Sequence, residues 1–172
     1  MDASYHEMGS LMWITNQTRL DIANAVRAVV RFSHDPQEVH VKAANNWKII
    51  EYLSAMAHLG LTFRKDSKLE DVQLDYDLET YVDGYYAHKA DGRRSVSCVA
   101  VCCGGTLVSW SSRTQKCLAL STTEAEYVAM ADGVKEAHYV GGVLVFLMPS
   151  LGLPSIGVFR DNKGVILLVK TL

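Results

Sequence analysis

Hydrophobic and polar positions in the first third of this chain follow a helical period. From about residue 21 to residue 58, apolar residues recur at the spacing of three and four that amphipathic helices show. Asp35-Pro36 interrupts this pattern, because proline cannot continue a helix and restricts the residue before it. Two helices are therefore expected, followed by a short strand over residues 59–64. The pattern predicts a helical segment spanning residues 1–64.

Residues 65–77 form a charged linker. After it, the spacing of apolar residues is typical of the strands and helices of an α/β unit. Residues 79–82 combine β-branched and aromatic side chains and predict a strand, and residues 156–159 predict another. Between them, Gly104-Gly105 supplies the positive φ angles that a tight β-hairpin turn requires. Strand, hairpin and helix are expected in that order.

The helix of this α/β unit has a recognisable beginning and end. Ser121 or Thr122 is expected to cap its first turn, and Glu124 completes a capping pattern. The apolar run over residues 141–148 is closed by Pro149. This run is expected to form the buried end of the same helix.

Four segments carry a more specific pattern. Residues 109–127 read SWSSRTQKCLALSTTEAEY, residues 81–87 read YVDGYYA, residues 91–97 read DGRRSVS and residues 158–166 read VFRDNKGVI. In this order they resemble the ribonuclease H domain of copia-like retrotransposon polyproteins. The N-terminal part resembles the connection between reverse transcriptase and ribonuclease H in those polyproteins. The resemblance implies a ribonuclease H-like mixed sheet with packed helices.

The resemblance also implies a carboxylate site. The family's first Asp falls on Asp83, its Glu on Glu126 and its second Asp on Asp161. Ribonuclease H chemistry uses two metal ions about 3.5–4 Å apart, and hard ions such as Mg²⁺ or Mn²⁺ take oxygen ligands. Glu124 lies about 200° around the helix from Glu126 and is assigned to capping. An isolated Asp or Glu in such a position is usually a turn, cap or surface residue. The surrounding motifs favour the interpretation as a metal site.

Three departures from the family pattern favour loss of catalysis. The family continues past the helix expected over residues 163–170 into a further strand, a helix and a fourth acidic ligand, whereas this sequence stops at Leu172. Tyr85 stands where the family has a second Asp. Arg160 stands where the family has Cys, and a cation there would compete with a bound metal. We therefore expect a C-terminally incomplete domain with an underligated site.

Composition limits the kinds of partner. The net charge is -2 and the pI is about 6.3, so there is no global basic field for non-specific nucleic-acid binding. Any nucleic-acid contact must be local, and Trp110 is a stacking candidate that the pattern favours more as a core residue. The candidate phosphate-binding cations are Arg93, Arg94, Arg113 and Lys116.

The cysteines and the termini bear on location. The four cysteines form no paired framework, and the histidines complete no zinc motif, which favours a reducing compartment, the cytoplasm or nucleus, including that of a host cell. The first residues lack the basic and apolar regions of a secretory signal peptide. No stretch approaches 18 uninterrupted apolar residues, so membrane insertion is not expected.

These observations define the expected architecture and leave two functions open. We expect a helical, connection-like segment over residues 1–64 and a ribonuclease H-like α/β domain over residues 78–172. The favoured function is a retrotransposon-derived protein that is non-catalytic or weakly active and acts by binding an unknown protein partner, including as a host-acting secreted effector of a pathogen. The alternative is a magnesium-dependent ribonuclease H that cuts RNA in RNA–DNA hybrids. A hybrid-cleavage assay separates the two.

Overall fold

A computed structural model describes residues 2–30, 48–63, 77–87 and 92–161. The chain divides into two compact units, Met1–Thr62 and Phe63–Leu172. The expected break at Asp35-Pro36, most of the expected linker and the helix expected over residues 163–170 lie outside the described residues.

The first unit is helical. It contains α1 (Asp2–Gln17), the 3₁₀ turn η1 (Leu20–Ile22), α2 (Ala23–Val30) and α4 (Lys48–Ala55). The periodicity that predicted helices from residue 21 onward did not predict α1. The strand predicted over residues 59–64 is wrong for its described part, because residues 59–63 have no regular secondary structure.

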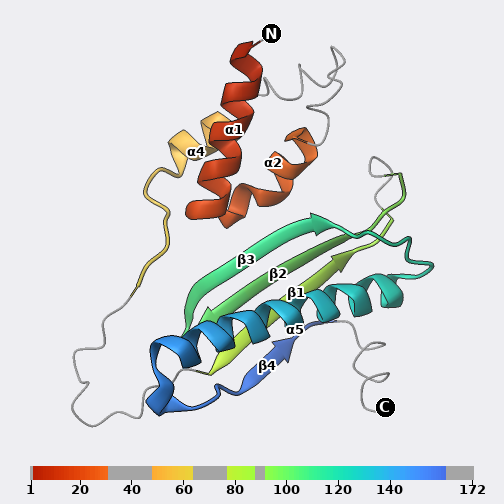
Figure 1. Ribbon diagram of the computed structural model, residues 1–172. Coiled ribbons are helices and arrows are strands. Elements are labelled where there is room, and N and C mark those ends of the chain that lie inside the picture. Colours follow the sequence, from red (N-terminus) through yellow and green to blue (C-terminus); the bar gives the residue numbers. More distant parts are fainter. Residues whose placement is uncertain (1, 31–47, 64–76, 88–91, 162–172) are drawn as a thin grey trace. The chain divides into compact units, whose positions relative to one another are not determined.

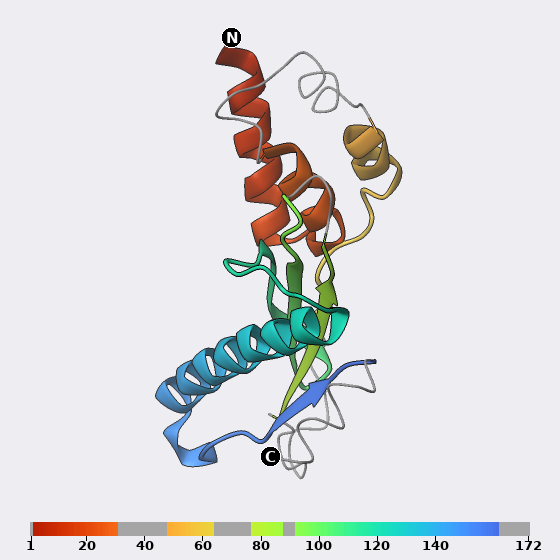
Figure 2. The same cartoon turned by 90° about the vertical axis from the view of Figure 1, so that its right-hand side faces the viewer.

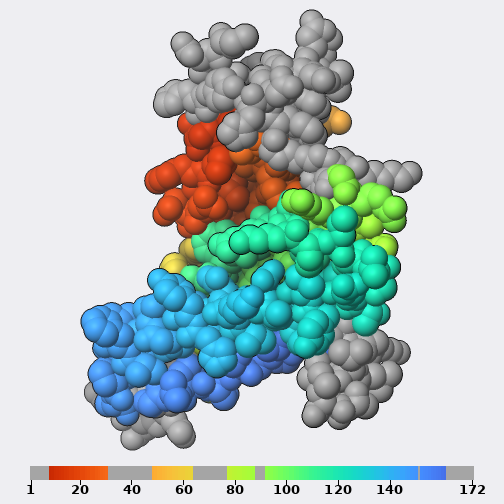
Figure 3. Space-filling model, turned by 45° about the vertical axis from the view of Figure 1, so that its right-hand side comes forward, coloured from red at the N-terminus to blue at the C-terminus, as the bar shows by residue number. Residues whose placement is uncertain are grey.

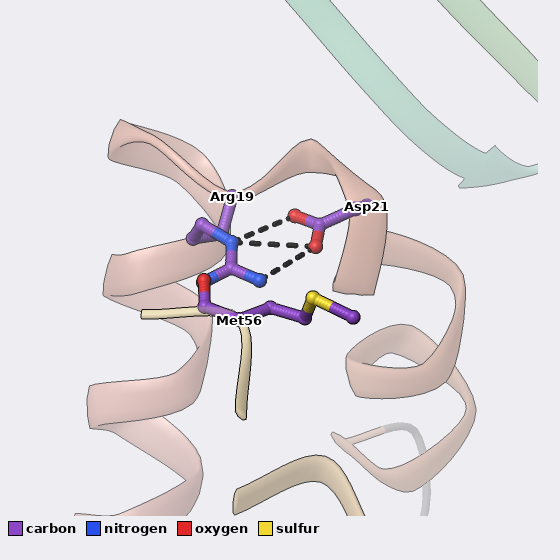
Figure 4. A network of polar contacts seen from close by, with 3 residues as sticks. All are labelled: Arg19, Asp21 and Met56. Carbon is purple, nitrogen blue, oxygen red and sulfur yellow. Dashed lines mark hydrogen bonds and ion pairs between the residues drawn. The ribbon is translucent and has the colours of Figure 1, made fainter. Parts of the chain in front are cut away.

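An ion pair joins the elements of this unit (Figure 4). The buried guanidinium of Arg19 donates from Nη2 to Oδ2 of Asp21 at 2.7 Å and from Nε to Oδ1 at 3.0 Å. Its Nη1 donates to the carbonyl of Met56 at 3.1 Å, and its Cζ lies 5.6 Å from the ring centroid of Tyr52. Arg19 therefore ties the segment between α1 and α2 to α4 and the residues that follow it.

The second unit contains a four-stranded mixed sheet among its described residues (Figure 1). Its strands are β1 (Leu78–Tyr85), β2 (Val96–Cys103), β3 (Thr106–Thr114) and β4 (Ile156–Phe159), in the spatial order β3-β2-β1-β4. The pairs β1–β2 and β2–β3 are antiparallel, and β1–β4 is parallel. The predicted mixed α/β class is confirmed, and the arrangement is consistent with a ribonuclease H-like fold.

The hairpin between β2 and β3 follows from local chemistry. Gly104 and Gly105 have φ angles of 54° and 72°, the positive values that a two-residue turn of this kind needs. The hairpin prediction is confirmed.

One long helix, α5 (Thr122–Leu147), connects β3 to β4 and lies across one face of the sheet (Figures 1 and 2). A row of small residues at every fourth position faces the strands, and all of them are buried: Ala125, Ala129, Gly133, Ala137 and Gly141. At Gly133 an added Cβ would clash with the side chain of Val82, so the row brings the helix backbone close to β1. The core beneath it is formed by Leu78, Val82, Val99 and Val101.

The C-terminal end of α5 differs from expectation. The run over residues 141–148 was expected to be the buried end of the helix, yet Val143, Phe146, Leu147 and Met148 are exposed. Figure 2 shows that the last turns of α5 extend past the strands. The sheet therefore covers little of their surface. Among the described residues, no helix combines the length and apolar character that a membrane crossing needs.

Candidate functional site

The predicted site begins on β1, where exposed and buried side chains alternate strictly. Asp83 has an exposed position, and Gly84 has a buried position under α5. A Cβ atom at Gly84 would lie 2.9 Å from the carbonyl oxygen of Ala125. Only glycine therefore allows the first turn of α5 to rest on the strand here, which brings Glu126 beside Asp83.

The first turn of α5 is fixed by its cap. The Oγ of Ser121 accepts a hydrogen bond from the backbone N–H of Glu124 at 3.1 Å. In return, Oε2 of Glu124 accepts one from the backbone N–H of Leu120 at 2.6 Å. The assignment of Glu124 to capping is confirmed, and Glu126 is left free for another role.

A buried glutamine braces the same turn. Nε2 of Gln115 donates to the carbonyl of Ala125 at 2.8 Å and to Oγ of Ser97 at 3.1 Å. This side chain holds the start of α5 against β2. The sequence reasoning singled out neither Gln115 nor Gly84, although both lie inside the matched motifs. A glycine directly after the motif aspartate was the available signal for a close helix–strand contact.

Strand register gives Asp161 and Asp83 corresponding positions on neighbouring strands. In the parallel pair β1–β4, Tyr81 is paired with Phe159, and their rings stack with centroids 5.2 Å apart. Asp83 follows Tyr81 by two residues, and Asp161 follows Phe159 by two residues. Both therefore lie at the carboxyl ends of neighbouring parallel strands, and both are exposed.

The charges of Asp83 and Asp161 act on the carboxyl group of Glu126. Its side chain is buried, with 7% of the residue exposed, and Oε2 has no hydrogen-bond partner. Burial raises the pKa of the Glu126 carboxyl, and the charge of Asp83 raises it further; hydrogen bonding by the Gly84 backbone opposes this. Asp161 makes a smaller raising contribution to this pKa, and Arg160 a smaller lowering one. The site thus brings the three predicted carboxylates into one electrostatic group around Glu126.

The carboxylate oxygens of these residues are ligands of the type that a hard divalent cation prefers. Carboxylate oxygens suit Mg²⁺ and Mn²⁺, and the unpartnered Oε2 of Glu126 offers a free lone pair. In the parts of the chain that the structure describes, no group of three or more His, Cys, Asp or Glu side chains is arranged to hold a metal ion. The assignment of Asp83, Glu126 and Asp161 as metal ligands and catalytic residues stays a prediction.

The four predicted phosphate-binding cations fall in two places. Arg93 and Arg94 are exposed in the turn before β2, where Arg93 has a φ of 63°. Arg113 and Lys116 are exposed at the end of β3 and line a hollow of about 430 Å³ between β3 and α5. Trp110 is half-buried on β3 opposite Ala100. Their role in nucleic-acid binding stays a prediction.

Comparison with known proteins finds retrotransposon polyproteins among the relatives of this chain. A Pol polyprotein of transposon TNT 1-94 from Nicotiana tabacum is 38% identical over 129 residues, 75% of this chain and 9% of that protein. The Pol polyprotein of transposon RE1 from Arabidopsis thaliana is 32% identical over 157 residues, 91% of this chain and 10% of that protein. This chain thus spans about a tenth of the length of these polyproteins.

Another relative is a protein of similar length. The secreted RxLR effector protein 161 of Plasmopara viticola is 32% identical over 133 residues, which cover 77% of this chain and 87% of that protein. No family model and no solved structure matches the chain.

Proposed function

We infer a function from one premise: the chain belongs to the family that contains the RxLR effector protein 161 and a segment of the Pol polyproteins of plant retrotransposons. We propose that it is a ribonuclease H-like protein of retrotransposon origin that acts through binding rather than through efficient cleavage. The observation that carries this proposal is the position of Arg160.

Arg160 places a fixed positive charge at the carboxylates. It directly precedes Asp161, and its Nη1 donates to Sδ of Met130 at 2.8 Å. Met130 lies one helical turn after Glu126 on α5, so the guanidinium is held along the side of the helix that carries Glu126. Its charge already acts on the Glu126 carboxyl. A resident guanidinium opposes the arrival of a divalent cation, which weakens metal binding there.

A cleavage assay tests the proposal directly. An RNA–DNA hybrid with labelled RNA would be incubated with the chain in millimolar Mg²⁺ or Mn²⁺, beside the Asp83→Asn variant as a matched control. We expect the wild type to cut no faster than Asp83→Asn. Cleavage that exceeds the control by a factor of about 100 or more, the usual scale for loss of one catalytic group, would overturn the proposal.

The proposed binding role is that of an effector acting inside a host cell, on a host protein. Its support is the similarity to the RxLR effector protein 161, of which this chain covers 87%. The test is to express the chain and Asp83→Asn in the cytoplasm of host cells and compare their effect on the host. We expect equal effects, since binding does not need the carboxylates. An effect that disappears with Asp83→Asn would point to nuclease action instead.

One observation favours a second candidate function, a magnesium-dependent ribonuclease H. The buried Oε2 of Glu126 has no partner, and a cation would supply one. In that case Asp83, Glu126 and Asp161 would hold Mg²⁺, which would activate water and stabilise the leaving oxygen. Arg113 and Lys116 would hold backbone phosphates of the hybrid. The cleavage assay above decides between the two functions.

A further inference from the structure

The outer face of the last turns of α5 carries large apolar side chains that are exposed among the described residues of the second unit. Tyr139 is 70% exposed and Phe146 is 82% exposed, and Val143 between them is also exposed. Gly142 lies beside Val143, and a Cβ added there would meet no atom within 4 Å. Figure 3 shows this end of α5 in blue, at the surface of the second unit. This is an apolar helix face without a partner among the described residues.

The four residues share one side of the helix. At about 100° per residue, Tyr139, Gly142, Val143 and Phe146 fall within an arc of about 100°. The opposite side carries Ala137 and Gly141, which are buried against the sheet. The apolar face of residues 139–146 is thus separate from the side of α5 that is buried on the sheet.

The order of side-chain sizes on this face is symmetric. Read from either end, it runs aromatic, small, small, aromatic, with its midpoint between Gly142 and Val143. If a second, identical helix lies antiparallel across it, Tyr139 of each copy meets Phe146 of the other, and Gly142 meets Val143. Two identical aromatic contacts then flank a thin centre that lets the helix axes approach to about 8 Å. A surface that is complementary to itself in this way is what a two-fold dimer requires.

Charge and area are consistent with the same occupant. Residues 137–148 contain no Asp, Glu, Lys or Arg, so the centre of the pairing carries no such charge. Lys135, one turn before Tyr139 on the same side of the helix, lies at the edge, where its 79% exposed side chain can stay in solvent. Two largely exposed aromatic residues and their neighbours present on the order of 500 Å² per copy. This is below the roughly 800 Å² per partner of a standard stable interface, which indicates a reversible dimer.

We propose that the outer face of α5 binds a second copy of this chain, antiparallel and about a two-fold axis, through Tyr139, Gly142, Val143 and Phe146. This inference is independent of the proposed function. It predicts a dissociation constant on the order of 10–100 μM, as expected for an interface of this size.

Sedimentation equilibrium of the full chain over a concentration series measures the dimer. We expect Phe146→Glu to weaken dimerisation at least tenfold, because it places a charge in the aromatic contact. Leu120→Glu is the matched control: this residue is 86% exposed at the other end of α5, and the variant should dimerise like the wild type. Equal melting temperatures verify that both variants fold. A wild type that stays monomeric up to about 500 μM, or a Phe146→Glu dimer of unchanged strength, would overturn the proposal.

A charge swap tests the antiparallel register. Tyr139→Lys and Phe146→Glu should each dimerise poorly alone. Mixed together, they should form a heterodimer with one Lys–Glu contact and one Tyr–Phe contact, at least tenfold stronger than either homodimer. A mixture no stronger than its components would rule out this register and favour another partner for the face.

Discussion

Gly84 and Glu126 are joined by a contact that no other residue type would allow at position 84. A Cβ atom there would stand 2.8 Å from the backbone nitrogen of Glu126. Residue 84 belongs to β1 and residue 126 to α5, so the missing side chain sets the distance between the two elements. The same contact places the Glu126 carboxyl beside Asp83. Burial is the largest cause of the raised pKa of Glu126, and the charge of Asp83 raises this pKa further.

The first prediction follows from this contact. Gly84→Ala should push α5 away from β1 and lower the free energy of unfolding by about 2 kcal/mol, the usual scale for overpacking. The melting temperature should fall by on the order of 10 °C for a domain of this size. Gly142→Ala is the control, measured at low micromolar concentration: an added Cβ there is unopposed, and alanine favours the helix by about 1 kcal/mol. An unchanged melting temperature for Gly84→Ala would contradict the close contact.

The second prediction concerns pH. The pKa of Glu126 is raised in the folded chain, so folding favours its protonated form. Its contribution to stability is therefore full below the ordinary carboxyl pKa and is lost as pH rises through the raised value. Glu126→Gln, which is neutral at all pH values, should be more stable than the wild type at pH 7 and equal to it near about pH 4. Melting curves at both pH values measure this; a variant less stable at pH 7 would show that the carboxylate is stabilised instead.

The third prediction concerns metal binding. If Arg160 opposes a divalent cation, millimolar Mg²⁺ should raise the melting temperature of the wild type by less than about 1 °C. Arg160→Ala removes the resident charge and should bind Mg²⁺ on the order of tenfold more tightly, giving a clear rise.

The control for the metal experiment is Asp83→Asn in the Arg160→Ala background. It should abolish the Mg²⁺-dependent rise, because it removes one of the charged oxygens. A large rise already in the wild type, removed by Asp83→Asn, would instead support the ribonuclease H function.

The fourth prediction addresses the helical unit. Asp21→Asn leaves the buried Arg19 guanidinium without its anion and should cost about 2 kcal/mol, less than a fully buried pair because Asp21 is partly exposed. The hydrogen bond from Arg19 is the main reason why the pKa of Asp21 is lowered. Its stabilisation is therefore present at neutral pH and lost as pH falls through the lowered value.

Denaturation at a series of pH values from 7 down to about 2 checks this, since the penalty of Asp21→Asn should shrink as pH falls. Lys135→Ala serves as the comparison, because Lys135 pairs with Asp132 at 3.8 Å on the surface and should be worth under about 0.5 kcal/mol. Equal effects of the two substitutions would mean that Arg19 is not a structural centre of this unit.

The sequence by itself determined the features that depend on neighbouring residues. Ser121 and Glu124 cap α5 through hydrogen bonds three or four residues apart, and Gly104-Gly105 makes the hairpin through its own φ angles. Such chemistry is readable because both partners lie in one short segment. The motif order likewise indicated the mixed α/β class.

Only the tertiary structure decided what depends on distant partners. The charges of Asp83 and Asp161 reach the Glu126 carboxyl because Gly84 admits α5 to β1 and because β4 pairs in parallel with β1. The apolar run at the end of α5 was expected to be buried, but whether it is covered depends on how far the strands extend beneath it. Burial of an apolar side chain is favourable wherever a neighbouring element can cover it. Only the packed elements around the side chain determine whether burial occurs.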